Sequence, residues 1–144
     1  MRNTIWPGFL FISLAVGQPV AAVPKNYPQG HFRADFDGKV AFQHSNWIYR
    51  FKDVTQVVGY YPGHYSRQRL NEIVEGRGID FAKITREYQW RKATVVEMTG
   101  IEPLSGLPID MRLIAAPTHT YIVMARTPEP QKNLRFLNSF EFLP

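Results

Sequence analysis

The stretch from Ile109 to Leu143 reads IDMRLIAAPTHTYIVMARTPEPQKNLRFLNSFEFL and has the densest apolar pattern in the chain. Alternating apolar residues predict a strand over 109–115, and a short Pro-containing loop precedes a second strand over 121–127. The second strand is apolar on both faces, which is typical of a central strand covered on both sides. A proline suited to a first helical position predicts a helix over 130–139, followed by a short Phe-rich strand. We therefore expect this stretch to form the folding core.

The chain before this stretch is rich in predicted strands and contains one further helix. Strands are predicted over 31–36, 47–52, 55–61, 84–90 and 93–100. Within the fourth of these, the alternation places Ile84, Tyr88 and Trp90 on one face. Ser66 can cap a helix that ends near Gly76, because its hydroxyl can accept a hydrogen bond from a free backbone amide in the first turn.

The first 22 residues have the pattern of a cleaved secretory signal peptide. Arg2 is followed by an apolar run over 9–16 and by small residues that predict cleavage after Ala22. The alternative is a membrane anchor, but the apolar run is far shorter than the roughly 20 residues that span a bilayer. We therefore expect an exported protein, in the bacterial periplasm or secreted, with no transmembrane anchor in the mature chain.

Cleavage would leave 122 residues, a size typical of one domain. Residues 23–30 read VPKNYPQG, and their prolines and glycine predict an extended lead-in. Residues 31–144 are then expected to form a single α+β domain, because many strands in antiparallel order are combined with a few helices.

Charge and cysteine content exclude several classes of function. The chain has no cysteine, which excludes disulfides, thiolate metal sites and cysteine redox chemistry. Loss of Arg2 with the signal peptide lowers the formal net charge from +5 to +4. The basic residues lie singly or in pairs and form no basic tract, so no nucleic-acid partner is expected. A weak contact with an acidic partner or an anionic membrane surface stays open.

From His31 onward, the order of elements resembles the PsbP-like superfamily, which includes PsbP, the Ran-binding Mog proteins and the DcrB-type proteins. The resemblance is carried by Phe32–Gly38, by Thr55–Tyr61 leading into the Ser66 helix, and by the ending segments Thr120–Val123 and Arg135–Phe140. It implies an antiparallel β-sheet covered by helices on both faces, an α-β-α sandwich, and it implies no catalysis. The chain lacks the lipid-modified cysteine of the DcrB-type lipoproteins.

No motif for catalysis, a metal or a cofactor is present, and none of the three is predicted. The four histidines are His31, His44, His64 and His119, and none has a metal-ligand spacing. Strand periodicity aligns His31 with Asp35 and Asp37, but Arg33 lies between them, and we interpret this as a solvated strand face. Ser105 does not lie in a nucleophile elbow.

The strongest candidate for a binding surface is a corner between a strand and a helix that is rich in tyrosine and arginine, the residue types that anchor interfaces. Its residues are Tyr60, Tyr61, His64, Tyr65, Arg67 and Arg69. Trp90, followed by Arg91 and Lys92, is a second and weaker candidate. The competing interpretation is that half of these tyrosines belong to the core, because a strand buries alternate positions.

We therefore expect a non-catalytic periplasmic or secreted binding or accessory module that docks a protein partner. Two alternatives stay open: a small exported hydrolase with its site at the sheet ends, and an immunity or envelope-stress type binding protein. A buried polar cleft that holds a histidine beside a carboxylate would favour the hydrolase. An exposed aromatic and basic surface without a cleft would favour binding.

Overall fold

The computed structural model describes residues 24–76 and 80–143, so the predicted signal peptide lies outside the described residues. Its main unit is an antiparallel seven-stranded sheet. In spatial order the strands are β3 (Ala41–Gln43), β4 (Asn46–Phe51), β5 (Val54–Pro62), β9 (His119–Arg126), β8 (Pro108–Ala115), β7 (Ala93–Ile101) and β6 (Asp80–Trp90). A three-stranded sheet has the order β1 (Lys25–Tyr27), β2 (Phe32–Ala34) and β10 (Glu141–Phe142), and a short 3-10 helix, η1 (Pro28–Gly30), links β1 to β2.

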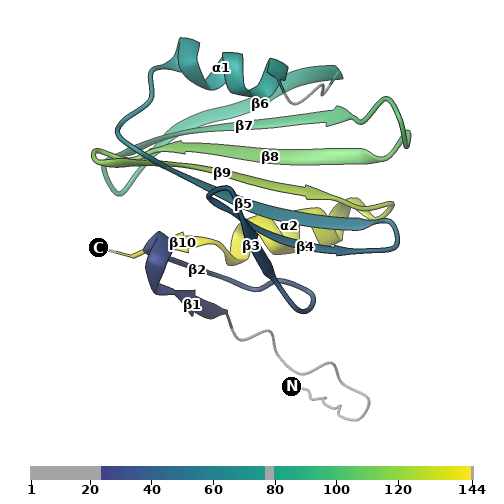
Figure 1. Ribbon diagram of the computed structural model, residues 1–144. Coiled ribbons are helices and arrows are strands. Elements are labelled where there is room, and N and C mark those ends of the chain that lie inside the picture. The colour runs from purple at the N-terminus through teal and green to yellow at the C-terminus, as the bar shows by residue number, and fades with distance from the viewer. Residues whose placement is uncertain (1–23, 77–79, 144) are drawn as a thin grey trace, which may run out of the picture.

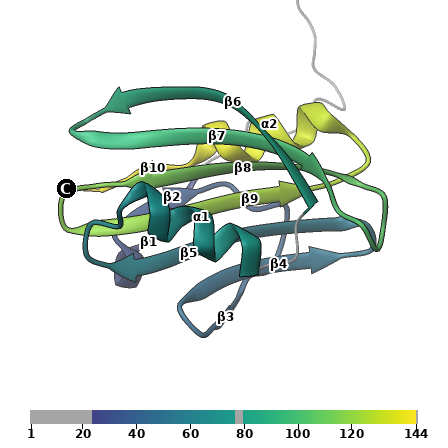
Figure 2. The same ribbon diagram turned by 90° about the horizontal axis from the view of Figure 1, so that it is seen from above.

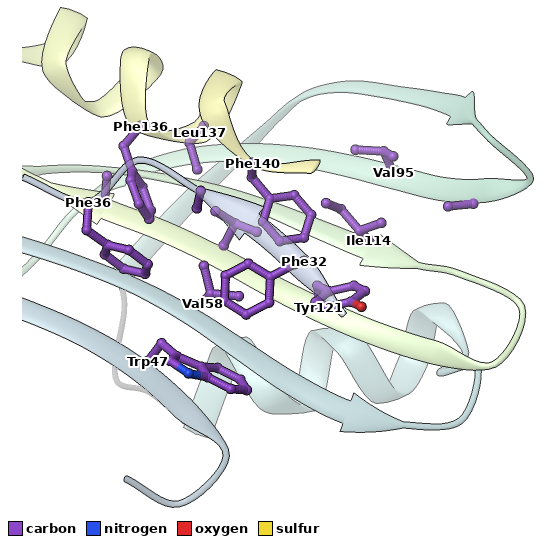
Figure 3. Close-up of a cluster of buried hydrophobic side chains, with 14 of the residues drawn as sticks. Phe32, Phe36, Trp47, Val58, Val95, Ile114, Tyr121, Phe136, Leu137 and Phe140 are labelled. Carbon is purple, nitrogen blue, oxygen red and sulfur yellow. The ribbon is translucent and has the colours of Figure 1, made fainter. Parts of the chain in front are cut away.

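The helices α1 (Arg67–Gly76) and α2 (Pro130–Ser139) lie on opposite sides of the seven-stranded sheet (Figures 1 and 2). One face is covered jointly by α2 and the three-stranded sheet. There Phe32 of β2 is fully buried and stacks on Phe140, with ring centroids 5.6 Å apart. Figure 3 shows both rings beside Val58 and Tyr121 of the large sheet. This aromatic layer is the larger of the two cores.

The other face of the sheet carries α1. Leu70 is only 2% exposed and packs with Met111, Leu113 and Ile122 of the central strands. It is the one fully buried side chain among those of α1 that the structure describes. The helix is therefore anchored to the sheet mainly through Leu70.

The predicted α-β-α sandwich is wrong. The chain is mostly β, with 52% of its residues in strands and two short helices, and the layer beside α2 is a sheet. Part of the expected lead-in forms β1, where Lys25 pairs with Ala34 of β2, and β10 pairs with the other side of β2. The sequence predicts β2, within 31–36, and β10, after the second helix, but it predicts neither β1 nor the pairing of the three into a second sheet, because a three-residue strand beside prolines carries almost no periodicity.

Most other predicted elements are confirmed, including both helices and the central position of β9, which is fourth of seven strands. The strand β3 was not predicted. In β6 the register shifts between Ile84 and Arg86, so that Ile84 pairs with Met98 whereas Tyr88 pairs with Val95. Residues that pair directly across two strands lie on the same face of the sheet. Met98 belongs to the core beneath α1 and Val95 to the aromatic core on the other face. The prediction that Ile84 and Tyr88 share one face is therefore wrong, because the register shift separates them.

A polar network joins α2 to the sheet beside the aromatic core. Arg112 of β8 forms an ion pair with Glu97 of β7 at 2.9 Å and donates a hydrogen bond to the Leu137 carbonyl at 2.9 Å. Burial alone would raise the pKa of Glu97, but hydrogen bonds from Arg86 and Tyr88 and the charge of Arg112 lower the pKa overall. The ionised carboxylate therefore stabilises the attachment of α2.

The two ends of the large sheet present different loops. One end, here called the histidine end, carries the β3–β4 turn, the β5–α1 connection, the β8–β9 turn and all four histidines. The opposite end, here called the loop end, carries the β4–β5 turn and the β7–β8 loop (Figure 1). Within residues 24–76 and 80–143, no helix is long and apolar enough to cross a membrane.

Candidate functional site

The predicted tyrosine and arginine corner lies at the histidine end but does not form one continuous surface. Because successive strand residues point to opposite faces, Tyr60 and Tyr61 separate at the end of β5. Tyr60 packs on the aromatic core beside Tyr121, with ring centroids 5.5 Å apart. Tyr61 lies on the α1 face beside Tyr65, with ring centroids 5.8 Å apart.

The part of the corner on the α1 face lines a groove of about 410 Å³, here called the α1 groove. Its residues are His64, Tyr65, Ser66, Gln68, Arg69 and Glu72. The Ser66 hydroxyl accepts a hydrogen bond from the Arg69 amide at 3.2 Å, which confirms the predicted cap of this helix. The Arg69 guanidinium lies over the Tyr65 ring, 5.0 Å from its centroid, an attractive cation–π arrangement.

Hydrogen bonds to the β8–β9 hairpin fix the chain between β5 and α1. The Thr120 hydroxyl is buried, accepts from the Tyr65 amide at 3.0 Å and donates to the Gly63 carbonyl at 2.8 Å. Gly63 has φ +94, a conformation that favours glycine, and His64 Nδ1 lies 3.1 Å from the Ala116 carbonyl oxygen. The floor of the α1 groove is therefore held in place before anything binds there.

The two arginines of the corner have different surroundings. Arg67 forms an ion pair with Glu87 of the edge strand β6 at 2.7 Å and so fastens α1 to that edge. Arg69 is exposed and forms no ion pair with any residue that the structure describes. Of the two predicted arginines, Arg69 is the one whose charge is available to a partner.

Tyr60 belongs to a group of stacked rings that the sequence reasoning missed, here called the histidine stack. His119 stacks on Tyr60 with ring centroids 5.0 Å apart and on His31 with ring centroids 5.6 Å apart. Burial raises the pKa of the Tyr60 hydroxyl. His31 comes from the end of η1 and His119 from the start of β9, so no local sequence pattern reports their contact.

Trp90 does not join this corner. It lies at the end of β6, four strands away from β5, and packs edge-on against Phe142 with ring centroids 5.0 Å apart. The next residue, Arg91, places its guanidinium 5.3 Å from the centroid of the Trp90 ring and forms an ion pair with Glu141. Hydrogen bonds from Arg33 and Arg91 lower the pKa of Glu141. Trp90 is therefore a partly buried residue at the margin of the aromatic core.

The predicted solvated strand face of His31, Asp35 and Asp37 does not form, because β2 ends at Ala34 and both aspartates lie in the loop after it, where their side chains are partly buried and paired with arginine. Arg135 of α2 lies 2.6 Å from Asp37 and 3.8 Å from Asp35, and Arg33 lies 2.7 Å from Glu141. Over the described ranges, no group of three or more histidine, aspartate or glutamate side chains is arranged to hold a metal ion. These acids connect β2, the loop after it, α2 and β10.

The groove also bears on the hydrolase alternative. It contains both His64 and Glu72, but both side chains are exposed and the groove is open to solvent. Ser105 lies at the loop end, where its hydroxyl donates to the Glu102 carboxylate and accepts from the Leu107 amide at 3.2 Å. The α1 groove is therefore an open surface lined by the half-buried Tyr65 and the exposed Arg69, and not a buried polar cleft.

Comparison of the chain with family models, with curated proteins and with solved structures returned no match. The resemblance to the PsbP-like superfamily stays a prediction from the sequence.

Proposed function

We propose that this chain is a non-catalytic binding module that docks a protein partner at the α1 groove. The observation that carries the proposal is the Tyr65–Arg69 pair, a cation–π pair above an open groove whose backbone is fixed to the sheet by Thr120. Tyrosine and arginine are the residue types that most often anchor protein interfaces. A preformed groove also reduces the ordering that binding requires.

The chemistry of the groove favours a partner that carries an acidic group. A planar guanidinium can donate two parallel hydrogen bonds to one carboxylate, and Arg69 has no acidic partner among the described residues. The exposed side chains of Ser66 and Gln68 line the same groove and can hydrogen-bond to the segment around that carboxylate. We expect the partner to insert an aspartate, a glutamate or a C-terminal carboxylate beside Tyr65.

The cellular location of this interaction is proposed from the sequence alone. The signal-peptide pattern of residues 1–22 supports a place in the bacterial periplasm or outside the cell, and the element order supports a PsbP-like relative. An immunity or envelope-stress role would use the same groove and differ only in the identity of the partner. A hydrolase is less well supported, because His64 and Glu72 are both exposed.

The proposal can be tested by affinity capture from detergent-solubilised envelope of the native organism, followed by mass spectrometry. Wild-type protein is compared with Tyr65→Ala/Arg69→Ala, which removes the pair that lines the groove. The matched control is Phe51→Ala/Lys52→Ala, because Lys52 lies over the exposed Phe51 ring at 5.3 Å in a similar pair at the loop end. Thermal unfolding verifies that both variants stay folded.

We expect a protein that is captured by the wild type and by the control and is lost from the groove variant. Loss of the anchors should weaken binding by about 2 kcal/mol or more, a fall in affinity of roughly thirtyfold. Equal capture by all three proteins, or equal loss from both variants, would remove the α1 groove as the docking site.

A further inference from the structure

His64 lines the α1 groove, and the fold determines which of its two ring nitrogens is left for a partner. Its Nδ1 lies 3.1 Å from the Ala116 carbonyl oxygen, in the connection between β8 and β9. Because a carbonyl oxygen can only accept a hydrogen bond, this contact assigns the proton of the neutral imidazole to Nδ1. Nε2 then carries no proton in the neutral ring, and it becomes a second donor only when the ring takes up a proton.

The hydrogen bonds of the neighbouring residues hold His64 in place. The Gly63 amide donates to the Thr118 carbonyl at 2.8 Å, and the Tyr65 amide donates to the Thr120 hydroxyl at 3.0 Å. The residues on both sides of His64 are therefore fixed to the β8–β9 hairpin. The imidazole itself is exposed, so it can exchange a proton with solvent without any opening of the fold.

The charged side chains that line the α1 groove balance each other while His64 is neutral. They are Arg69 and Glu72, which lie three positions apart on α1. Neither forms an ion pair with any described residue, and the exposed Glu75, one helical turn further along, does not line the groove. Protonation of His64 therefore changes the net charge of the groove lining from zero to +1.

Among the described residues, the elements beside the groove bring no second group that could change charge in the same way. From β5 the neighbour is the phenol of Tyr61, and from the edge strand β6 it is Glu87, which is paired with Arg67. His119, at the start of β9, stacks on Tyr60 on the other face of the sheet. Histidine is the one residue type of the groove lining whose charge ordinarily changes between about pH 5 and pH 8.

We propose that His64 is the second cation of the α1 groove and that it couples docking of the acidic segment to the uptake of a proton. In the acidic part of this pH range, the imidazolium adds a positive charge and an Nε2 donor to the groove that holds the Arg69 guanidinium. At higher pH, Arg69 acts alone and Glu72 opposes it. Docking is therefore stronger at acidic pH. The inference rests on the proposed function, because it requires an acidic segment in the groove.

The pH dependence can be measured with a capped hexapeptide of alternating glycine and aspartate, whose carboxylates stay ionised above about pH 5. Binding is followed by NMR at pH 5.5 and pH 7.5, from the shifts of the backbone amides around the groove. One added charge with a charge-assisted hydrogen bond at an exposed site should make the wild type bind about three- to tenfold more tightly at pH 5.5. The same peptide with asparagine in place of aspartate should show no such gain.

Two histidine variants separate the role of His64 from other effects of pH. His64→Asn keeps an amide donor for the Ala116 carbonyl and removes the titrating ring, so its affinity should be equal at both pH values. The matched control is His44→Asn, because His44 is exposed on the β3–β4 turn and does not line the groove. This control should keep the full gain. Thermal unfolding verifies that both variants stay folded.

A measurement on the wild type alone complements the variants. Because coupling between two binding events is reciprocal, a peptide that binds the protonated ring more tightly must also favour its protonation. The NMR titration of the His64 ring should therefore move to higher pH when the peptide is bound.

Failure of this inference and failure of the proposed function give different results. Equal wild-type affinity at both pH values, an unchanged gain in His64→Asn, or a ring titration that the peptide does not move would overturn the role of His64. If Arg69→Ala still abolishes binding, the α1 groove stays the docking site. Binding that Arg69→Ala leaves unchanged, or the absence of any binding, would overturn acidic docking at the groove and this inference with it.

Discussion

Replacing Tyr121 by phenylalanine tests how the two sheets are held together. Tyr121 of β9 is 2% exposed, and its hydroxyl donates to the Gly30 carbonyl at 2.8 Å and to the His31 carbonyl at 3.1 Å. Both acceptors lie just before β2, so this hydroxyl connects the large sheet to the small one. Phenylalanine keeps the ring, which packs on Phe140 with centroids 5.1 Å apart, and removes only the hydroxyl.

The expected loss in the free energy of unfolding is set by the hydrogen bonds that the substitution removes. The hydroxyl has one proton, so its two contacts share a single hydrogen bond with a net value of about 1 kcal/mol. The His31 carbonyl still accepts from the Leu143 amide at 2.6 Å, whereas the Gly30 carbonyl loses its partner in a buried position. With that desolvation cost, Tyr121→Phe should lower the free energy of unfolding by about 1.5–2 kcal/mol.

The assay is urea unfolding of the protein, followed by tryptophan fluorescence. The matched control is Tyr60→Phe, because the Tyr60 hydroxyl has no hydrogen-bond partner among the described residues, and its free energy of unfolding should change by less than about 0.5 kcal/mol. At the size of this domain, the loss in Tyr121→Phe corresponds to a fall in Tm of roughly 6–8 °C. An equal effect of the two substitutions would refute the assigned role of the Tyr121 hydroxyl.

The same hydroxyl predicts a dependence on alkaline pH. Burial raises the pKa of Tyr121 above its unfolded value of about 10. Its contribution to stability is therefore complete below about pH 10 and is lost as the pH rises further toward the folded pKa. Unfolding curves recorded at increasing pH should decline less steeply for Tyr121→Phe than for the wild type. Identical declines would contradict this assignment.

Three further perturbations test the framework around the site. Glu97→Gln should cost about 1–2 kcal/mol at neutral pH. Because the folded pKa of Glu97 is lowered, that contribution is present above the unfolded pKa and is lost as the pH falls through the folded value, so acid unfolding curves of wild type and variant should converge. Gly30→Ala would place its Cβ 2.6 Å from the Trp47 ring and should lower the urea midpoint by an amount equivalent to about 1–3 kcal/mol. Leu70→Ala removes the main anchor of α1 and should cost about 2–4 kcal/mol in urea unfolding, with faster hydrogen exchange confined to α1.

The strands and helices that bury a regular face could be predicted from the sequence. In β8 the alternate residues Ile109, Met111 and Leu113 are all buried, as their spacing predicts. The layer that covers the large sheet beside α2 was predicted wrongly. Its strands are two or three residues long, and although β1 pairs with the nearby β2, the pairing of β10 with β2 joins residues more than 100 positions apart, such as Glu141 and Arg33. Contacts over such separations leave no local pattern, and the helical cover on both faces was implied only by the resemblance to the PsbP-like superfamily.

The candidate site could be predicted only in part. Composition identified the corner, and the cap at Ser66 located the start of α1. The phase of β5 decided that Tyr60 packs on the aromatic core and Tyr61 on the α1 face, and the tyrosine that lines the groove is Tyr65. The pairing of Arg67 with Glu87 and the contact of His31 with His119 depend on tertiary structure, so neither was visible in the sequence.

The most direct test of partner docking is photo-crosslinking in cells of the native organism. A benzophenone amino acid replaces Gln68, an exposed residue that lines the α1 groove, and in a parallel protein replaces the exposed Leu134 on the opposite face. We expect a discrete protein adduct from position 68 that is absent from position 134 and disappears when Arg69→Ala is added. Adducts of equal yield from both positions, or an adduct at position 68 that survives Arg69→Ala unchanged, would contradict docking at the α1 groove.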